Sequence, residues 1–342
     1  MFVLFIIFLL ICIFGIKFNN SNVTSDDFLS RNTTLAINGI FVGIIFFSHF
    51  NSYVNFTDKL DLIYYDIIYH KIGQLMVCPF LFFSGYGIYE SIKYKSNYMK
   101  TFFKSRFLKL FISFAIIILF YIVLNYLLGY HYSISKILLS FVGFESIGNS
   151  NWFIFATFYL YLITLLSFKK SKNNFNSIMI VAIFSFIYII LIDNLKGYSF
   201  WYNTIFCYVA GMIFSYFRDS IVKYLSNNMS YFITFFLLCL VFLFGYMHQR
   251  NYLIYEIYSI CFVLLIVLLN MKFKIGNKII IFLGKNTFNI YAIQRLFFIL
   301  FKDLGLIDYG IYVYFFVCLL CTLLLSYILT YLYKYLFKCL KL

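Results

Sequence analysis

The sequence predicts an all-α, polytopic membrane protein with about eleven transmembrane helices. Of its 342 residues, 64% are hydrophobic and only 11% are charged, which is too apolar for a soluble globular domain. Apolar stretches of about 20 residues, long enough to cross roughly 30 Å of hydrocarbon, recur along the whole chain. Because hydrocarbon offers no water to pair with backbone groups, these stretches must be helices.

Eleven such segments can be read in order, separated by short polar loops. They lie at residues 2–18, 35–54, 72–92, 107–129, 152–168, 176–194, 202–217, 230–247, 252–271, 284–301 and 310–333. The first segment could instead be a signal peptide, but it lacks a basic beginning and a convincing cleavage site, so we interpret it as a span. We therefore expect an N-terminal span and linker at 1–34 and one membrane domain at 35–342.

The positive charges fall into alternate loops. The net charge is +15, and one alternating set of loops holds 20 lysines and arginines, whereas the other holds six. By the positive-inside rule the rich set is cytoplasmic, so we expect the N-terminus outside and the C-terminus inside. This topology accounts for the basic charge without a nucleic-acid partner. The Asn-, Ile- and Lys-rich composition is typical of an A·T-rich coding genome and predicts a bacterial plasma membrane.

The eight cysteines are scattered, and nearly all of them lie inside apolar segments. Buried free thiols behave as small hydrophobic side chains, so no disulfide framework is indicated. Cys318 and Cys321 form a C-x-x-C pair in the middle of an apolar helix with no histidine nearby. We therefore expect no metal site.

An ionisable residue inside a span is costly and is a candidate for function. His49, in "NGIFVGIIFFSHF", is the only histidine within a segment. An imidazole in apolar surroundings stays uncharged and can accept a proton, as a general base must, but a structural histidine fits equally well. Asn38 lies eleven residues earlier on the same helical face, roughly 16 Å away along the axis. One groove could hold both, or Asn38 could pair with a neighbouring helix.

The stretch "LFFSGYGIYES" at 81–91 places Ser84 and Gly85 inside the third segment, shortly after Pro79. Proline frees a backbone carbonyl and glycine allows close approach, which fits a distorted helix lining a cavity. Close packing of two helices through small residues fits the same pattern.

Among the residues of the predicted spans, Arg295 has the highest free-energy cost of burial in the membrane. Its helix begins on the cytoplasmic side near Gly284, so the guanidinium lies near mid-membrane and needs a partner or a wet cavity. Glu256 in the preceding span is one candidate partner, and an anionic ligand is another. Gln294 beside it adds an amide.

Basic residues crowd the stretch at 93–110, most of them in keeping with the topology. Arg106 and Lys109 are three residues apart at the start of a helix, which predicts one shared face that could grip phosphates. On the other side of the membrane, the loop at 131–148 is long enough for a short interfacial helix, a candidate lid or acceptor platform.

Several pieces of the chain, in this order, resemble the acyltransferase 3 family, in particular its branch associated with O-acetylation of bacterial surface polysaccharides. The resemblance covers roughly residues 35 to 335. The matching pieces are "LAINGIFVGIIFFSHF", "PFLFFSGYGI", "RFLK", "NWFIFATFYLYL" and "FLGKNTFNIYAIQR".

The resemblance implies a ten-helix acyltransferase core and an integral membrane O-acyltransferase. His49 would be the catalytic histidine, acting as general base or acyl carrier, and Ser84 would assist at the oxyanion. Acyl-CoA, most simply acetyl-CoA, would be the donor. The acceptor would be a hydroxyl of a capsular or other surface polysaccharide, or of its lipid-linked precursor.

The same resemblance supplies a set of binding residues. Arg106, Lys109 and Lys285 would meet the phosphates of the donor. Trp152 would support a sugar ring or belong to the aromatic belt at the outer boundary. The sequence departs from the family at Asn38 and Gln294, which replace an arginine and a histidine, and at Lys109, which replaces the second arginine of a pair. The expected binding residues are thus Asn38, Gly85, Tyr86, Arg106, Lys109, Trp152, Lys285, Gln294 and Arg295.

Two other functions explain polar residues in spans. A transporter or flippase for a lipid-linked glycan is one, although transporter folds are often built from repeats and none is visible here. A glycan polymerase is the other, although the outer loops are short for an enzyme that must hold a polymer.

Overall fold

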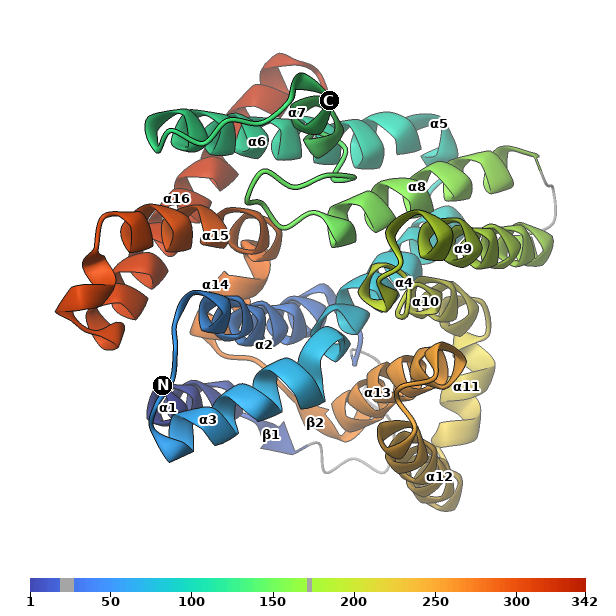
Figure 1. Cartoon of the computed structure of the whole chain (residues 1–342). Coiled ribbons are helices and arrows are strands. Elements are labelled where there is room, and N and C mark those ends of the chain that lie inside the picture. Colours follow the sequence, from blue (N-terminus) through green and yellow to red (C-terminus); the bar gives the residue numbers. More distant parts are fainter. Residues whose placement is uncertain (19–27, 171–173) are drawn as a thin grey trace.

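The computed structural model describes residues 1–18, 28–170 and 174–342. The chain is 82% helical, which confirms the predicted all-α fold class. Figure 1 shows the helices packed around one another in a single bundle. Their bounds are α1 Phe2–Ile13, α2 Arg31–Phe50, α3 Lys59–Tyr65, α4 Cys78–Tyr94, α5 Tyr98–Phe102, α6 Lys109–Leu127, α7 Ile134–Ser140, α8 Trp152–Lys170, α9 Asn174–Lys196, α10 Phe206–Tyr216, α11 Arg218–Leu225, α12 Asn228–Met247, α13 Tyr252–Lys272, α14 Lys278–Lys285, α15 Thr287–Asp303 and α16 Ile311–Cys339.

Helices stand at all eleven predicted segments, but fewer of them qualify as spans by themselves. Within the described residues, eight are long and apolar enough to cross a membrane, or nine if the bent pair Ser199–Tyr216 and Arg218–Leu225 counts as one. The difference lies mainly at α1 and α15. The first has 12 residues, and the second has 17 and carries several polar side chains. These helices nonetheless indicate a multi-pass membrane protein.

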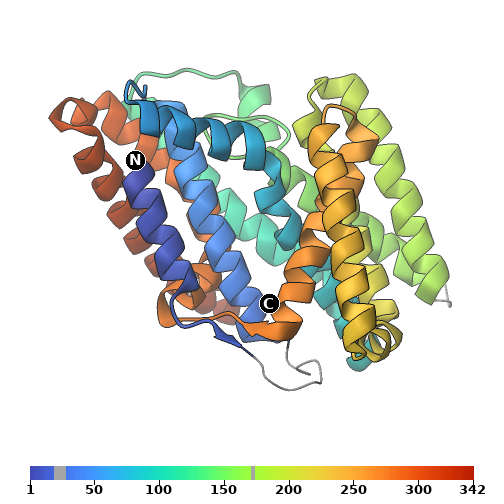
Figure 2. The same ribbon diagram turned by 90° about the horizontal axis from the view of Figure 1, so that it is seen from below.

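Helix α1 packs beside α2, as Figure 2 shows. Its first residues meet Asp61, whose carboxylate accepts from the backbone N–H of Phe2 at 2.8 Å. Its other end meets Asn277, whose amide donates to the carbonyl of Ile11. A two-residue strand follows, β1 (Lys17–Phe18), which pairs antiparallel with β2 (Phe273–Lys274). This ribbon joins two loops that both belong to the lysine-rich set.

Two helix pairs are locked together through glycines. A Cβ at Gly39 of α2 would meet the carbonyl of Ile280, and one at Gly284 of α14 would meet the carbonyl of Leu35. The pair α4 and α10 is built in the same way. A Cβ at Gly85 would meet the carbonyl of Tyr208, and a Cβ at Gly211 would meet that of Phe82. Both pairs therefore approach more closely than side chains would allow.

Irregular turns precede two of the helices. A π-helical turn (Asp66–Ile72) and a 3-10 turn (Gly73–Val77) lead into α4, and Pro79 stands in the first turn of that helix, where its missing N–H costs nothing. The stretch 81–91 itself is regular helix. A second π-helical turn (Phe103–Leu108) joins α5 to α6. Such turns are often found at functional sites.

Candidate active site

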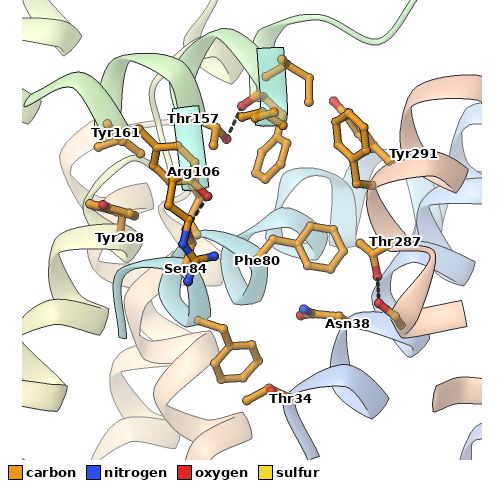
Figure 3. Close-up of a pocket in the computed structure, with 18 of the residues that line it drawn as sticks. Thr34, Asn38, Phe80, Ser84, Arg106, Thr157, Tyr161, Tyr208, Thr287 and Tyr291 are labelled. Carbon is orange, nitrogen blue, oxygen red and sulfur yellow. Dashed lines mark hydrogen bonds between the residues drawn. The ribbon is translucent and has the colours of Figure 1, made fainter. Parts of the chain in front are cut away.

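A cavity of about 420 Å³ opens between α2, α4, α8, α10, α14 and α15. Figure 3 shows side chains from these helices converging on it. A volume of this size is ordinary for a small-ligand site, and the mixture of apolar walls and a few polar groups is also typical. The polar and aromatic hydroxyl-bearing residues that line it are Thr34, Asn38, Ser84, Arg106, Thr157, Tyr161, Tyr208, Lys285, Thr287 and Tyr291.

One side of the cavity holds a group of tyrosines around Arg106. The Nε of Arg106 donates to the hydroxyl of Tyr98 at 2.9 Å, and the rest of the guanidinium reaches toward Ser84 (Figure 3). The hydroxyl of Ser84 is 3.2 Å from that of Tyr161. Among the residues that the structure describes, no acidic side chain lines this cavity. The guanidinium therefore has no carboxylate there to neutralise it, which suits an anionic ligand.

The opposite side is formed by α2, α14 and the start of α15. Asn38 extends into the cavity, and its Oδ1 is buried without a hydrogen-bond partner among the described residues. Lys285 lies at the end of α14, next to the first turn of α15, where Thr287 also lines the cavity. An unpaired amide oxygen and an ammonium group thus face the same space as Arg106.

His49 lies at the far end of α2 from Thr34 and faces the protein interior. Its Nδ1 is 2.7 Å from the amide nitrogen of Gln294 on α15, and its ring lies 6.0 Å from that of Tyr291, centroid to centroid. The side chain is partly exposed, while its neighbours Ser48 and Phe50 are buried. His49 does not itself line the cavity. Tyr291 does, so the imidazole neighbours one residue of the cavity wall.

Arg295 has a partner that the sequence did not suggest. Its Nε donates to the hydroxyl of Tyr53 at 3.0 Å, and its guanidinium carbon lies 5.9 Å from the centre of that ring. Glu256 on α13, considered above as a partner, instead reaches the start of α10, where its Oε2 accepts from the N–H of Phe206 at 3.2 Å. Of the two partners that the sequence suggested for Arg295, the ion pair with Glu256 is therefore a wrong prediction.

Arg106 and Lys109 do not share a face. Arg106 lines the cavity, whereas the Lys109 ammonium lies 5.3 Å from the centre of the Phe337 ring on α16. The π-helical turn Phe103–Leu108 explains the difference, because its wider winding rotates the side chain three residues on away from the position that an α-helix gives.

Three other expected site residues lie outside this cavity. Gly85 packs against the backbone of Tyr208, and Tyr86 is buried in the core beside Phe214. Trp152 begins α8 and has its ring 6.4 Å from that of Phe200. Both interpretations of the 81–91 stretch hold in part. Gly85 allows the close packing of two helices, and the neighbouring Ser84 lines the cavity.

A second cavity, of about 570 Å³, lies at the opposite end of the bundle, near the C-terminal end of α2. It shares no lining residue with the first. The hydroxyl group that holds Arg295 belongs to Tyr53, which also lines this second cavity. Its lining residues are Ser52, Tyr53, Tyr130, Ile299, Lys302 and Asp303.

Sequence reasoning missed the tyrosines of the site, namely Tyr53, Tyr98, Tyr161, Tyr208 and Tyr291. The chain has 33 tyrosines, so the residue type alone carries no signal. Only Tyr291 offered a spacing, three residues before Gln294, that places both on one face of a helix.

The comparison with protein families gives one match, to the family described as an acyltransferase domain, over residues 36–331. No curated protein and no solved structure gives a significant match. The matched region contains His49, Gln294, Arg295, the lining residues of the second cavity and those of the first except Thr34. The chain therefore belongs to the acyltransferase 3 family and is a membrane-embedded acyltransferase.

Proposed function

We propose that this protein is an integral membrane O-acyltransferase, most simply an O-acetyltransferase. It transfers an acyl group from acyl-CoA to a hydroxyl of a surface or capsular polysaccharide, or of the lipid-linked precursor. The observation that carries the proposal is that neighbours of His49 line two separate cavities. Tyr291, whose ring lies 6.0 Å from the imidazole, lines one that holds Arg106 and Lys285, and Tyr53, four residues after His49, lines one that holds Asp303 and Lys302.

The first cavity suits the donor. Arg106 and Lys285 are at the lysine-rich, cytoplasmic end of the bundle in the topology that we infer from the loops. Charged hydrogen bonds from these two cations are the contacts that a phosphorylated donor such as CoA needs. Asn38 and Ser84 supply polar groups for the thioester arm, which would extend toward Tyr291 and the imidazole beyond it.

The second cavity suits the acceptor. In the same topology it opens on the outer face, where a surface glycan or its lipid-linked precursor is found. Tyr130 and Tyr53 offer aromatic rings and hydroxyls, and Asp303, Lys302 and Ser52 offer donors and acceptors for sugar hydroxyl groups. Trp152 lines neither of these two cavities, so its role toward the sugar stays a prediction.

In the proposed reaction His49 takes the proton from the acceptor hydroxyl, whose oxygen attacks the thioester carbonyl carbon. Collapse of the tetrahedral intermediate breaks the carbon–sulfur bond. The imidazolium then returns its proton to the departing sulfur, so CoA leaves as the thiol and the ester remains on the sugar. Arg295, held by Tyr53, lies within electrostatic range of His49 and favours negative charge at the reacting oxygen.

The test is mass spectrometry of the surface glycan from cells that lack the gene, complemented with the wild type or with His49→Ala. We expect the deletion strain to make a glycan of normal length without the acyl group, restored by the wild type only. His49→Ala should reach the membrane in normal amount. A glycan that is absent from the deletion strain supports a flippase instead, and a shortened one supports a polymerase. Restored acylation with His49→Ala refutes the catalytic role.

A further inference from the structure

The contact between His49 and Gln294 determines which imidazole nitrogen carries the hydrogen. The amide nitrogen of Gln294 lies 2.7 Å from Nδ1 of His49. An amide NH₂ group only donates, so Nδ1 must offer its lone pair and the ring hydrogen must be on Nε2.

A second contact holds the amide in this orientation. The same amide nitrogen donates to the backbone carbonyl of Tyr291 at 3.3 Å. If the amide were turned over, its oxygen would face that carbonyl instead. The Gln294 side chain is fully buried, and its Oε1 has no hydrogen-bond partner among the described residues. A buried oxygen without a partner raises the free energy of the folded protein. In this orientation Oε1 therefore remains an unused hydrogen-bond acceptor.

The observed orientation does not suit a general base. With hydrogen on Nε2 and the Nδ1 lone pair engaged by Gln294, the ring has no free lone pair for a hydroxyl proton. A protonated ring would also point its Nδ1–H at the amide NH₂. Arg295 and Tyr291 face the same ring, and neither supplies a negative charge to stabilise an imidazolium. Turning the amide over would bring the unpaired Oε1 of Gln294 to Nδ1 as an acceptor.

We propose that Gln294 is a positioning residue that sets the tautomer of His49. In the resting protein its NH₂ group keeps hydrogen on Nε2. When the amide turns over, Nε2 gives its proton to water and Nδ1 takes one from water, which the partly exposed ring allows. Oε1 then accepts from Nδ1–H, and Nε2 presents a lone pair to the acceptor hydroxyl. The same oxygen stabilises the imidazolium that forms. The inference rests on the proposed function only where it uses His49 as the base; the resting tautomer follows from the contacts alone.

The resting tautomer can be measured without any activity, by nitrogen NMR of protein labelled in its histidines and held in lipid nanodiscs. The signals of His49 are assigned by their loss in His49→Ala. We expect hydrogen on Nε2 in the wild type. Gln294→Glu, which offers only acceptors, should move the hydrogen to Nδ1, and Gln294→Leu, which offers neither group, should give a mixture. The same tautomer in all three proteins overturns the proposal.

Asn289 provides a matched control. It is a buried amide on the same helix, but its NH₂ group donates to the carbonyl of Ser326 and to Thr330, away from the histidine. Asn289→Leu should leave the His49 signals unchanged even if it lowers the yield of folded protein. A change as large as that of Gln294→Leu would mean that any lost amide disturbs the ring, which also overturns the proposal.

Kinetics test the second half of the proposal. We expect Gln294→Leu to lower kcat about 100-fold with little change in KM for acyl-CoA, and Gln294→Glu to retain most of kcat. A carboxylate beside Nδ1 also stabilises the protonated ring, so the acidic limb of the pH–rate profile should move to higher pH by roughly 1 unit or more. An unchanged kcat in Gln294→Leu overturns this half. A wild type without transferase activity refutes the proposed function, while the NMR result still decides the tautomer.

Discussion

The hydroxyl of Tyr53 accepts a hydrogen bond of 3.0 Å from the guanidinium Nε of Arg295, which lies on α15. The two residues are 242 positions apart in the chain, and the bond joins the turn after α2 to the middle of α15. It holds a cation within electrostatic range of His49, through a tyrosine that lines the second cavity.

Tyr53→Phe should therefore be destabilising, because it leaves a largely enclosed guanidinium without its acceptor. We expect a loss of about 1–3 kcal/mol in the free energy of unfolding and a fall in acyl transfer. Thermal unfolding in detergent and an acylation assay measure the two effects. Tyr309→Phe, on a tyrosine that is 78% exposed, is the control. Equal behaviour of the two variants would show that the bond matters little.

Arg106→Gln should weaken donor binding. Because this guanidinium lines the cationic cavity, we expect KM for acyl-CoA to rise about 10- to 100-fold, with a smaller change in kcat. Lys109→Gln is the control, since that ammonium lies over the Phe337 ring outside the cavity. Initial rates in membranes at varied acyl-CoA measure both. The donor site would have to be placed elsewhere if Lys109→Gln raised KM as much as Arg106→Gln.

Gly85→Ala and Gly87→Ala should have different effects, although the two residues are only two positions apart on α4. A Cβ at position 85 would collide with the carbonyl of Tyr208, whereas one at position 87 meets nothing within 4 Å. We expect Gly85→Ala to cost about 1–3 kcal/mol and Gly87→Ala to be neutral or to stabilise by about 0.5–1 kcal/mol. Thermal unfolding in detergent distinguishes them. A neutral Gly85→Ala would mean that α4 and α10 can separate at no cost.

Glu256 should stabilise α10 by capping its first turn, and its negative charge should contribute little. Helix α10 has no capping side chain of its own, and the Glu256 carboxylate accepts from its Phe206 N–H. Glu256→Gln keeps an acceptor oxygen and should preserve stability, while Glu256→Leu should cost about 1 kcal/mol. The yield and melting temperature of the purified variants measure this. A Gln variant as damaged as the Leu variant would indicate that the negative charge itself is needed.

The sequence predicted the fold class, the helix positions and the family, because hydrophobic length and order are properties of the chain read locally. It also named His49, Asn38, Ser84 and Arg106 as candidate site residues, and the last three line one cavity. These predictions needed only the periodicity of single helices and the order of short motifs.

The sequence alone could not predict contacts between helices that are far apart in the chain. Nothing local pairs Arg295 with Tyr53, or His49 with Gln294, which is 245 positions away. The Arg106 and Lys109 pair failed for a different reason. The spacing rule assumed α-helical winding, and the π-helical turn Phe103–Leu108 is set by packing and not by a recognisable sequence signal.

The separation of the two cavities also bears on the energetics of the cell. Because they share no lining residue, the transfer proposed above would carry an acyl group from one face to the other while the bilayer stays sealed to protons and salts. The membrane potential would then survive every turnover, and the protein needs none of the rocking that carriers use. Proteoliposomes loaded with a pH-sensitive dye should hold a proton gradient as long as empty vesicles do, with or without donor present.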